Sequence, residues 1–312
     1  MRVLSPAKIN LHLRVGPKQL DGFHPLVTWM VSVGLFDTLD FSLDTAGRVS
    51  LSCSDPSLPV DDRNLVVRAA RLLQAEAART SGGESSISGP VAGEPGVRIE
   101  LLKVIPTGGG LGGGSSNAAV TLIALNELWG LNLPRQRLSE LAAGIGSDVP
   151  FFLGGPSGIC PSTICSSAIC TGRGEVVSRV DSPSATWVVL MLPDMSMPTP
   201  AVYRQFDQMP FSPGWNEAIG WSQQCPPAEE LLRLLRNDLE PPAFAISPEL
   251  GRLRKTAETL VSRPVRMSGS GSSLFTLFSD REVAEKAAFL IHSQLALRTM
   301  TVPIAVISNL QK

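Results

Sequence analysis

The chain has 312 residues, of which 43% are hydrophobic and 18% are charged, and its formal net charge is −1. This length and apolar content predict a sizeable core in one large or two ordinary domains, and they exclude a disordered chain. The balanced charge and the lack of a Lys/Arg run argue against nucleic-acid binding, and no stretch approaches the ~18 apolar residues of a membrane span. Without an apolar leader after Met1, we expect a cytoplasmic protein.

The first predicted element is a strand over residues 7–15. Apolar residues alternate there with polar ones, so that one face is apolar. Lys8 and Asn10 share the opposite face with two further polar residues. That polar face is either exposed to solvent or directed into a functional site.

The segment up to residue 101 is predicted to form a turn, a strand, a helix, a surface loop and a second strand, over 21–24, 26–33, 65–79, 80–96 and 97–101. The turn has the sequence Asp-Gly-Phe-His. Acidic residues precede the helix, where the helix dipole favours negative charge.

A glycine-rich segment, 106–119 (PTGGGLGGGSSNAA), gives the strongest functional signal. Glycine allows positive φ angles and lets a ligand approach the backbone closely. Apolar residues at helical spacing follow directly and predict a helix over 116–129. A glycine loop that leads into a helix N-terminus offers free N–H groups and the positive end of a dipole. We therefore predict that this segment binds phosphate.

This loop differs from the common nucleotide-binding motifs. Gly108-x-Gly110-x-x-Gly113 matches the dinucleotide pattern, but residues 130–134 lack the acidic residue expected ~20 positions on. The patterns of P-loop proteins and of protein kinases are also missing. A flexible linker would not connect an apolar strand directly to an apolar-faced helix. A phosphate loop of another kind remains.

A second motif, 146–150 (GSDVP), follows a short helix predicted over 135–143. Asp148 stands before an apolar run, where it is either a helix cap or a catalytic carboxylate. Next comes a Ser- and Cys-rich stretch, 156–172, which is expected to be irregular. Its cysteines lack both the spacing and the histidines of a zinc site, so we predict no metal site and free thiols in a surface loop, at Cys160, Cys165 and Cys170.

We predict a domain boundary near residue 182, which gives domains 1–182 and 183–312. The second domain is predicted to hold three strands and three helices, over 187–192, 274–278 and 302–307, and over 228–236, 249–261 and 283–294. Ser279-x-x-Glu282 would be the capping box of the last helix. The loop 268–273 (SGSGSS) is either a turn that enters a strand or a backbone nest that closes over phosphates.

Four segments, taken in order, resemble the GHMP small-molecule kinases: 6–11 (PAKINL), 106–119, 146–150 and 268–271. Three more resemble the members whose acceptor carries a cytidyl group, in the non-mevalonate isoprenoid pathway: 21–24 (DGFH), 62–70 (DRNLVVRAA) and 237–240 (NDLE). The resemblance spans nearly the whole chain. It implies a two-domain α/β (α+β) fold, with the active site in the cleft between the domains, and an ATP-dependent small-molecule kinase.

The resemblance also implies roles for individual residues. Asp148 would be the general base of phosphoryl transfer and Lys8 its charged neighbour. ATP and Mg²⁺ are the implied cofactors, and no metal site made by protein residues alone is assigned. The residues implied to bind ATP are Asn64, Lys103, Pro106, Gly108, Gly109, Gly110, Leu111, Gly112, Gly113, Gly114, Ser115 and Ser116.

On the acceptor side, the resemblance implies that Asn10 holds Lys8 or the substrate hydroxyl. His24 would recognise the edge of the cytosine with Phe23 beside it, and Tyr203 would stack on the base. Phe23 replaces the tyrosine of many members, so any contact through that hydroxyl is lost. A small-molecule substrate, no nucleic-acid or membrane partner, and a monomer or homodimer are expected.

Two other hypotheses remain open on the sequence. One is a GHMP kinase with another acceptor, such as homoserine or a mevalonate-like alcohol, although Phe23, His24 and Tyr203 favour an acceptor with a flat base. The other is a nucleotide-binding regulatory protein built on the same scaffold. The presence of both Lys8 and Asp148 favours an enzyme.

Overall fold

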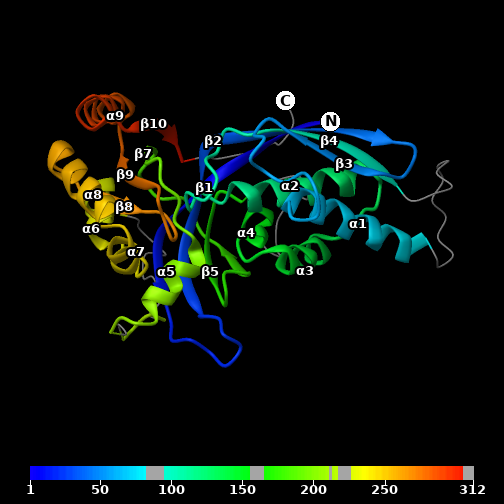
Figure 1. Ribbon diagram of the computed structural model, residues 1–312, viewed down its shortest axis with the longest axis horizontal. Helices are drawn as coiled ribbons and strands as arrows, with labels where there is room; N and C mark the ends of the chain where they lie inside the picture. Colours follow the sequence, from blue (N-terminus) through cyan, green and yellow to red (C-terminus); the bar gives the residue numbers. More distant parts are fainter. Residues whose placement is uncertain (82–94, 155–164, 211–212, 217–225, 305–312) are drawn as a thin grey trace.

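The computed structural model describes residues 1–81, 95–154, 165–210, 213–216 and 226–304, and it is built around two β-sheets (Figure 1). Within these residues the first sheet has six strands: β1 (Arg2–Val15), β2 (Leu26–Asp44), β3 (Val49–Cys53), β4 (Gly96–Leu102), β5 (Ser167–Thr171) and β6 (Val176–Arg179). Their order is β3-β4-β2-β5-β6, and β1 also pairs with β2; β3 and β4 run parallel and the other pairs antiparallel.

The second sheet is formed later in the chain, by β7 (Trp187–Leu192), β8 (Arg266–Met267), β9 (Leu274–Phe278) and β10 (Arg298–Pro303). It is antiparallel, in the order β10-β7-β9-β8. The predicted boundary near residue 182 lies between β6 and β7. The division into two domains at that point stays a prediction.

The helices gather on both sheets. Four share one apolar core with the first sheet: α1 (Leu65–Ser81), α2 (Gly113–Leu128), α3 (Arg135–Ile145) and α4 (Val149–Leu153). Figure 1 shows the other five near the second sheet: α5 (Thr199–Phe206), α6 (Ala228–Leu234), α7 (Glu240–Ile246), α8 (Pro248–Val261) and α9 (Arg281–Leu295). Among the described residues, none of these helices combines the length and apolar character that a membrane crossing needs.

Strand β1 connects the two halves of the molecule. Ala7, Ile9 and Leu11 on its apolar face are fully buried in a core shared with β7 and β9 of the second sheet. The polar face is buried as well, because Lys8 and Asn10 are only 3% and 4% exposed. The polar face is therefore not solvated. Burial of such groups costs free energy unless they are paired, which favours the alternative of a functional site.

Three predictions about local structure are wrong in detail. The last strand is β10, which ends at Pro303, whereas it was expected over 302–307; residues 305–307 lie outside the described residues. Helix α9 is capped by Asp280, whose Oδ1 accepts from Val283 N at 2.9 Å, in place of the predicted Ser279 box. The stretch 156–172 is regular at its end, since it contains β5.

The prediction of cysteines in a surface loop is also wrong. Cys165 and Cys170 are free thiols, but both are buried, and Cys170 lies on β5. Burial raises the pKa of both thiols, because a thiolate is poorly solvated in the core. They are therefore core residues rather than reactive groups. Cys160 lies outside the described residues.

His12 on β1 predicts a pH dependence of stability. It is 8% exposed, and its Nδ1 accepts a hydrogen bond from Arg236 N at 3.2 Å. Burial, followed by the charges of three arginines, lowers its pKa from 6.5 to about 4. Between these values the unfolded chain binds a proton that the folded protein does not. The free energy of unfolding therefore falls as the pH is lowered through this window, by up to ~3 kcal/mol.

Urea unfolding of the wild type and of His12→Asn at pH 7, 5.5 and 4.5 measures this contribution. The asparagine keeps an acceptor for the Arg236 amide but cannot titrate. We expect the variant to lose less stability between pH 7 and 4.5 than the wild type. Equal losses in the two proteins would show that His12 is not the titrating group.

Candidate active site

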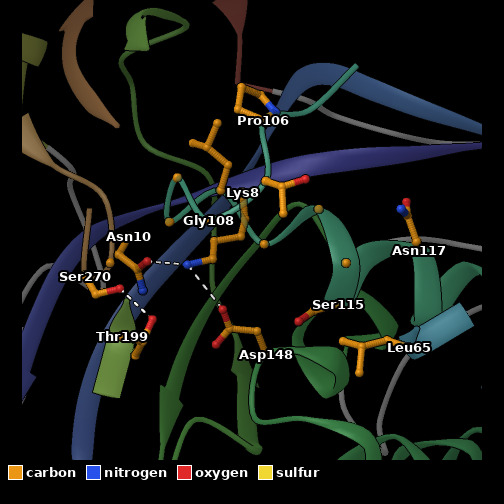
Figure 2. A pocket seen from close by; sticks show the side chains of 18 of the residues that line it. Lys8, Asn10, Leu65, Pro106, Gly108, Ser115, Asn117, Asp148, Thr199 and Ser270 are labelled. Carbon is orange, nitrogen blue, oxygen red and sulfur yellow. Dashed lines mark hydrogen bonds and ion pairs between the residues drawn. The ribbon is translucent and has the colours of Figure 1, made fainter. Parts of the chain in front are cut away.

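A cavity of about 420 Å³ lies where β1, the glycine-rich segment, α4 and the loop before β9 meet (Figure 2). Most of the residues predicted to form the site line it: Lys8, Asn10, Asn64, Lys103, Pro106, Gly108, Gly109, Gly110, Leu111, Gly112, Gly113, Gly114, Ser115, Asp148 and Tyr203. Phe23, His24 and Ser116 are not part of this lining. Ser116 is buried behind it, where its Oγ accepts from Ser5 Oγ at 2.7 Å.

The glycine-rich segment follows β4 in the chain and lines the cavity. Helix α2 begins within it, at Gly113. Gly108, Gly110 and Gly112 have φ angles of 71°, 76° and 67°, values that favour glycine. A Cβ on Gly112 would lie 2.9 Å from Cγ of Lys8, so the loop and β1 are in close contact. Helix α2 has 16 residues, and its first turn lies in the wall of the cavity. The N–H groups of that turn have no partner within the helix and are available to a ligand.

Lys8 projects from the buried polar face of β1 into this cavity. Its ammonium donates to Oδ1 of Asn10 and lies 3.2 Å from Oδ2 of Asp148 (Figure 2). Its backbone N–H donates to the Leu111 carbonyl at 2.9 Å, which fixes the strand against the loop. Asn10 Nδ2 in turn donates to Thr28 Oγ1 at 2.8 Å. The side chain of Lys8 is thus held in one position, with its charge next to a carboxylate.

Asp148 precedes α4, where the sequence left open whether it caps the helix. In the described part of the chain its side chain makes no capping hydrogen bond, and its carboxylate points toward Lys8. The Asp148 side chain is 34% exposed, compared with 4% for Lys8. A partly accessible carboxylate beside a fixed cation can accept a proton from a bound hydroxyl group. The geometry therefore favours the catalytic alternative.

The loop 268–273 closes the cavity from the side of the second sheet. Ser268 Oγ donates to the Gly110 carbonyl at 2.9 Å and accepts from Asn10 N at 3.2 Å. Asn237 supports this loop, since its Nδ2 donates to the carbonyls of Met267 and Gly269 at 2.9 and 2.8 Å. The sequence motif around Asn237 was noted, but it gave no signal of this supporting role.

Thr199, at the start of α5, was not predicted as a site residue. Its Oγ1 lies 2.8 Å from Oγ of Ser270, and both residues line the cavity (Figure 2). Only its place in the Pro-Thr-Pro sequence before Tyr203 could have drawn attention to it. This pair brings α5 and the loop 268–273 together at the wall opposite α2.

Of the residues expected to bind the acceptor, Tyr203 of α5 reaches the cavity and His24 lies behind it, with ring centroids 5.3 Å apart. Burial and the nearby charge of Asp148 raise the pKa of Tyr203 to about 12, so its hydroxyl stays neutral. Phe23 is 52% exposed, and the guanidinium of Arg173 lies 4.1 Å from the centre of its ring. Tyr203 and His24 are thus neighbours, and Tyr203 lies close enough to Asp148 for that charge to act on its pKa.

Both ring nitrogens of His24 already have partners within the protein. Nδ1 lies 2.9 Å from the Gly16 carbonyl, and Nε2 lies 2.9 Å from Oδ1 of Asp207. The expected recognition of a base by the ring edge would therefore require the ring to leave these partners. In this arrangement His24 instead holds the turn 21–24 against the end of α5.

Asn64 and Lys103, both expected to bind ATP, line the cavity but also bind neighbouring groups. Asn64 accepts from Val66 N at 3.0 Å and donates to the Pro59 carbonyl at 2.8 Å, so it caps α1. Lys103 forms an ion pair with Asp37. No three His, Cys, Asp or Glu side chains gather as a metal site among the described residues.

Comparisons with known proteins identify relatives of this chain. The family model for the GHMP kinases N-terminal domain matches residues 64–156, and the model for the GHMP kinases C-terminal domain matches residues 226–294. A curated 4-diphosphocytidyl-2-C-methyl-D-erythritol kinase from Nocardioides sp. is 38% identical, over 91% of this chain and 90% of that protein. The enzyme of the same name from Prochlorococcus marinus is 37% identical, over 91% and 86% of the two chains.

Solved structures are similar along the whole chain. A crystal structure of 4-(cytidine 5'-diphospho)-2C-methyl-D-erythritol kinase superimposes with a TM-score of 0.71 and 34% identity, over 97% of this chain and 98% of that one. A homoserine kinase from Cytophaga hutchinsonii has a TM-score of 0.69 at 18% identity, which shows a shared fold. The chain therefore belongs to the GHMP kinase superfamily, in the family of its 4-diphosphocytidyl-2-C-methyl-D-erythritol kinase relatives.

Proposed function

We propose that this chain transfers the γ-phosphoryl group of ATP to the 2-hydroxyl of 4-diphosphocytidyl-2-C-methyl-D-erythritol. The observation that carries the proposal is the Lys8–Asp148 pair, 3.2 Å apart, facing the glycine-rich segment across one cavity. The curated kinases of this name that are 34–38% identical to the chain support the choice of acceptor. The ring of Tyr203, which lines the cavity, also suits a flat base.

In the proposed reaction, Asp148 accepts the proton of the acceptor hydroxyl while the oxygen of that hydroxyl forms a bond to the γ-phosphorus. The bond from that phosphorus to the bridging oxygen breaks, and ADP leaves. Lys8, held by Asn10, faces both the carboxylate and the incoming phosphoryl charge, so it stabilises charge that develops during transfer. The N–H groups of the glycine-rich segment and of the first turn of α2 would hold the phosphates of ATP.

We also propose that Mg²⁺ accompanies ATP. This ion binds mainly through water and substrate phosphates, with one or two protein oxygens, so it needs no cluster of acidic residues. Ser115 supplies such an oxygen in the lining of the cavity. When bound, the ion neutralises phosphate charge.

The proposal is tested by ADP release with three acceptors side by side: the cytidyl substrate, homoserine and mevalonate. We expect turnover with the cytidyl substrate at least a hundredfold faster than with the others. Faster turnover of homoserine or mevalonate would reassign the acceptor within the same enzyme class. No turnover of any acceptor would contradict both enzyme hypotheses.

His24→Ala tests the acceptor side. Because the His24 ring contacts both the Gly16 carbonyl and the Asp207 carboxylate, its removal should loosen the turn 21–24 next to Tyr203. Loss of hydrogen bonds of this kind costs ~1–3 kcal/mol, so we expect the KM for the cytidyl substrate to rise about tenfold or more, with the KM for ATP unchanged. Asp207→Ala should act in the same direction. Equal increases in both KM values would show that His24 does not act specifically on binding of the acceptor.

A further inference from the structure

Asp37 of β2 is a buried carboxylate that the proposed reaction does not use. It is 0% exposed and pairs in register with Ser5 of β1. Within the described residues, its Oδ1 accepts from the backbone N–H groups of Val104 and Ile105, at 2.7 and 2.9 Å. Its Oδ2 accepts from the ammonium of Lys103 and from Asn117 Nδ2, the latter at 3.0 Å. A charge buried this deeply is stable only because it is paired and hydrogen-bonded.

These donors stand at the two ends of the glycine-rich segment. Lys103, Val104 and Ile105 form the chain that enters it after β4, and Asn117 lies in the first turns of α2, where the chain leaves it. Asn117 is 2% exposed, and its Oδ1 has no hydrogen-bond partner among the described residues. Asn117 also lines the cavity, and its amide nitrogen donates to Asp37. One carboxylate thus holds both ends of the phosphate loop.

Two partners of Asp37, Lys103 and Ile105, also lie close to Gly113 of the glycine-rich segment. A Cβ on Gly113, the first residue of α2, would lie 3.1 Å from Nζ of Lys103 and 3.0 Å from Cγ2 of Ile105. The side chain of Lys103 is only 7% exposed although the residue lines the cavity. Any movement of this ammonium or of Ile105 would shift the helix N-terminus that faces the cavity.

We propose that Asp37 is a positioning residue for the phosphoryl donor: it fixes the geometry of the glycine-rich segment through Lys103, Ile105 and Asn117. Lys103 acts in this arrangement by pairing with Asp37, and not as a free cation for the triphosphate. The inference rests on the proposed binding of ATP by this segment. It does not depend on the identity of the acceptor.

Asp37→Asn is the first test, because it keeps the size of the side chain but turns one acceptor into a donor that faces Lys103 and Asn117. The matched control is Asp40→Asn, on the same strand, where the carboxylate forms a solvent-exposed pair with Arg2. Calorimetric titration with ADP and Mg²⁺, without acceptor, is expected to show a Kd raised at least tenfold for Asp37→Asn. The control should stay within twofold, and the KM for the acceptor should stay within twofold in both variants.

A double-mutant cycle separates positioning from direct binding. If Lys103 acts through Asp37, Asp37→Asn/Lys103→Met should bind ADP no more weakly than the worse single variant. Additive losses would mean that Lys103 binds the nucleotide independently, and they would overturn the inference. Unchanged ADP affinity in Asp37→Asn would overturn it as well.

If Asp37→Asn does not fold, Asn117→Leu tests the same idea with one donor removed. We expect the Kd for ADP to rise severalfold, and an unchanged Kd would overturn the inference. Because ADP binding is measured without acceptor, a wild type that binds ADP but does not phosphorylate the cytidyl substrate would contradict only the proposed function. A wild type that binds no ADP would contradict the inference itself.

Discussion

Replacing Asp148 with asparagine is expected to lower kcat by about a hundredfold or more, with little change in the affinity for ADP. The reason is chemical, because asparagine has nearly the same shape but cannot accept the proton of the acceptor hydroxyl. The carboxylate is 3.2 Å from Lys8 and makes no capping bond in the described chain, so its removal should leave α4 intact. Steady-state kinetics and calorimetric titration with ADP measure the two effects separately.

Asp280→Asn is a matched control, since Asp280 also precedes a helix but lies outside the lining of the cavity. Asparagine caps helices about as well as aspartate, so we expect neither stability nor kcat to change much. If Asp148→Asn kept nearly normal kcat, Asp148 would not be the base. A large loss of ADP affinity would instead indicate that it binds the nucleotide.

The sequence predicted the main components of the site because each belongs to a local pattern. Alternation over 7–15 put Lys8 and Asn10 on one face, and the density of glycines indicated the segment that lines the cavity. Whether that face is exposed to solvent or lines a site could not be predicted, because alternation along a strand does not show what packs on either side of it. In the structure the second sheet covers the apolar face of β1, and the polar face lines the cavity.

The residues that the sequence missed act over long separations. Asp37 accepts hydrogen bonds from residues that lie 66 to 80 positions away, and Asn237 donates to carbonyls that lie 30 and 32 positions away. Neither carries a local signal of these contacts. Short elements such as α4, with five residues, and β8, with two, were missed for a related reason. Such short segments are stabilised by tertiary packing and show no periodicity of their own.

Gly110→Ala is expected to weaken ADP binding by about a hundredfold. Gly110 has a φ of 76°, where a side chain costs ~1–2 kcal/mol. A Cβ there would overlap the carbonyl oxygen of Ser268, and that atom belongs to the backbone, which cannot turn away as a side chain would. The two loops must then separate, and the bond from Ser268 Oγ to the Gly110 carbonyl is lost. Together these terms reach ~3 kcal/mol.

Gly144→Ala is the control that separates this contact from a general effect of losing a glycine. Gly144 lies inside α3 and outside the lining of the cavity, and a Cβ there would meet no atom within 4 Å. Alanine favours the helix there, so stability should be kept or slightly raised. Calorimetric titration with ADP, together with thermal unfolding, should therefore show a large loss of affinity for Gly110→Ala alone. Equal losses in both variants would mean that the contact between the two loops does not determine the shape of the phosphate loop.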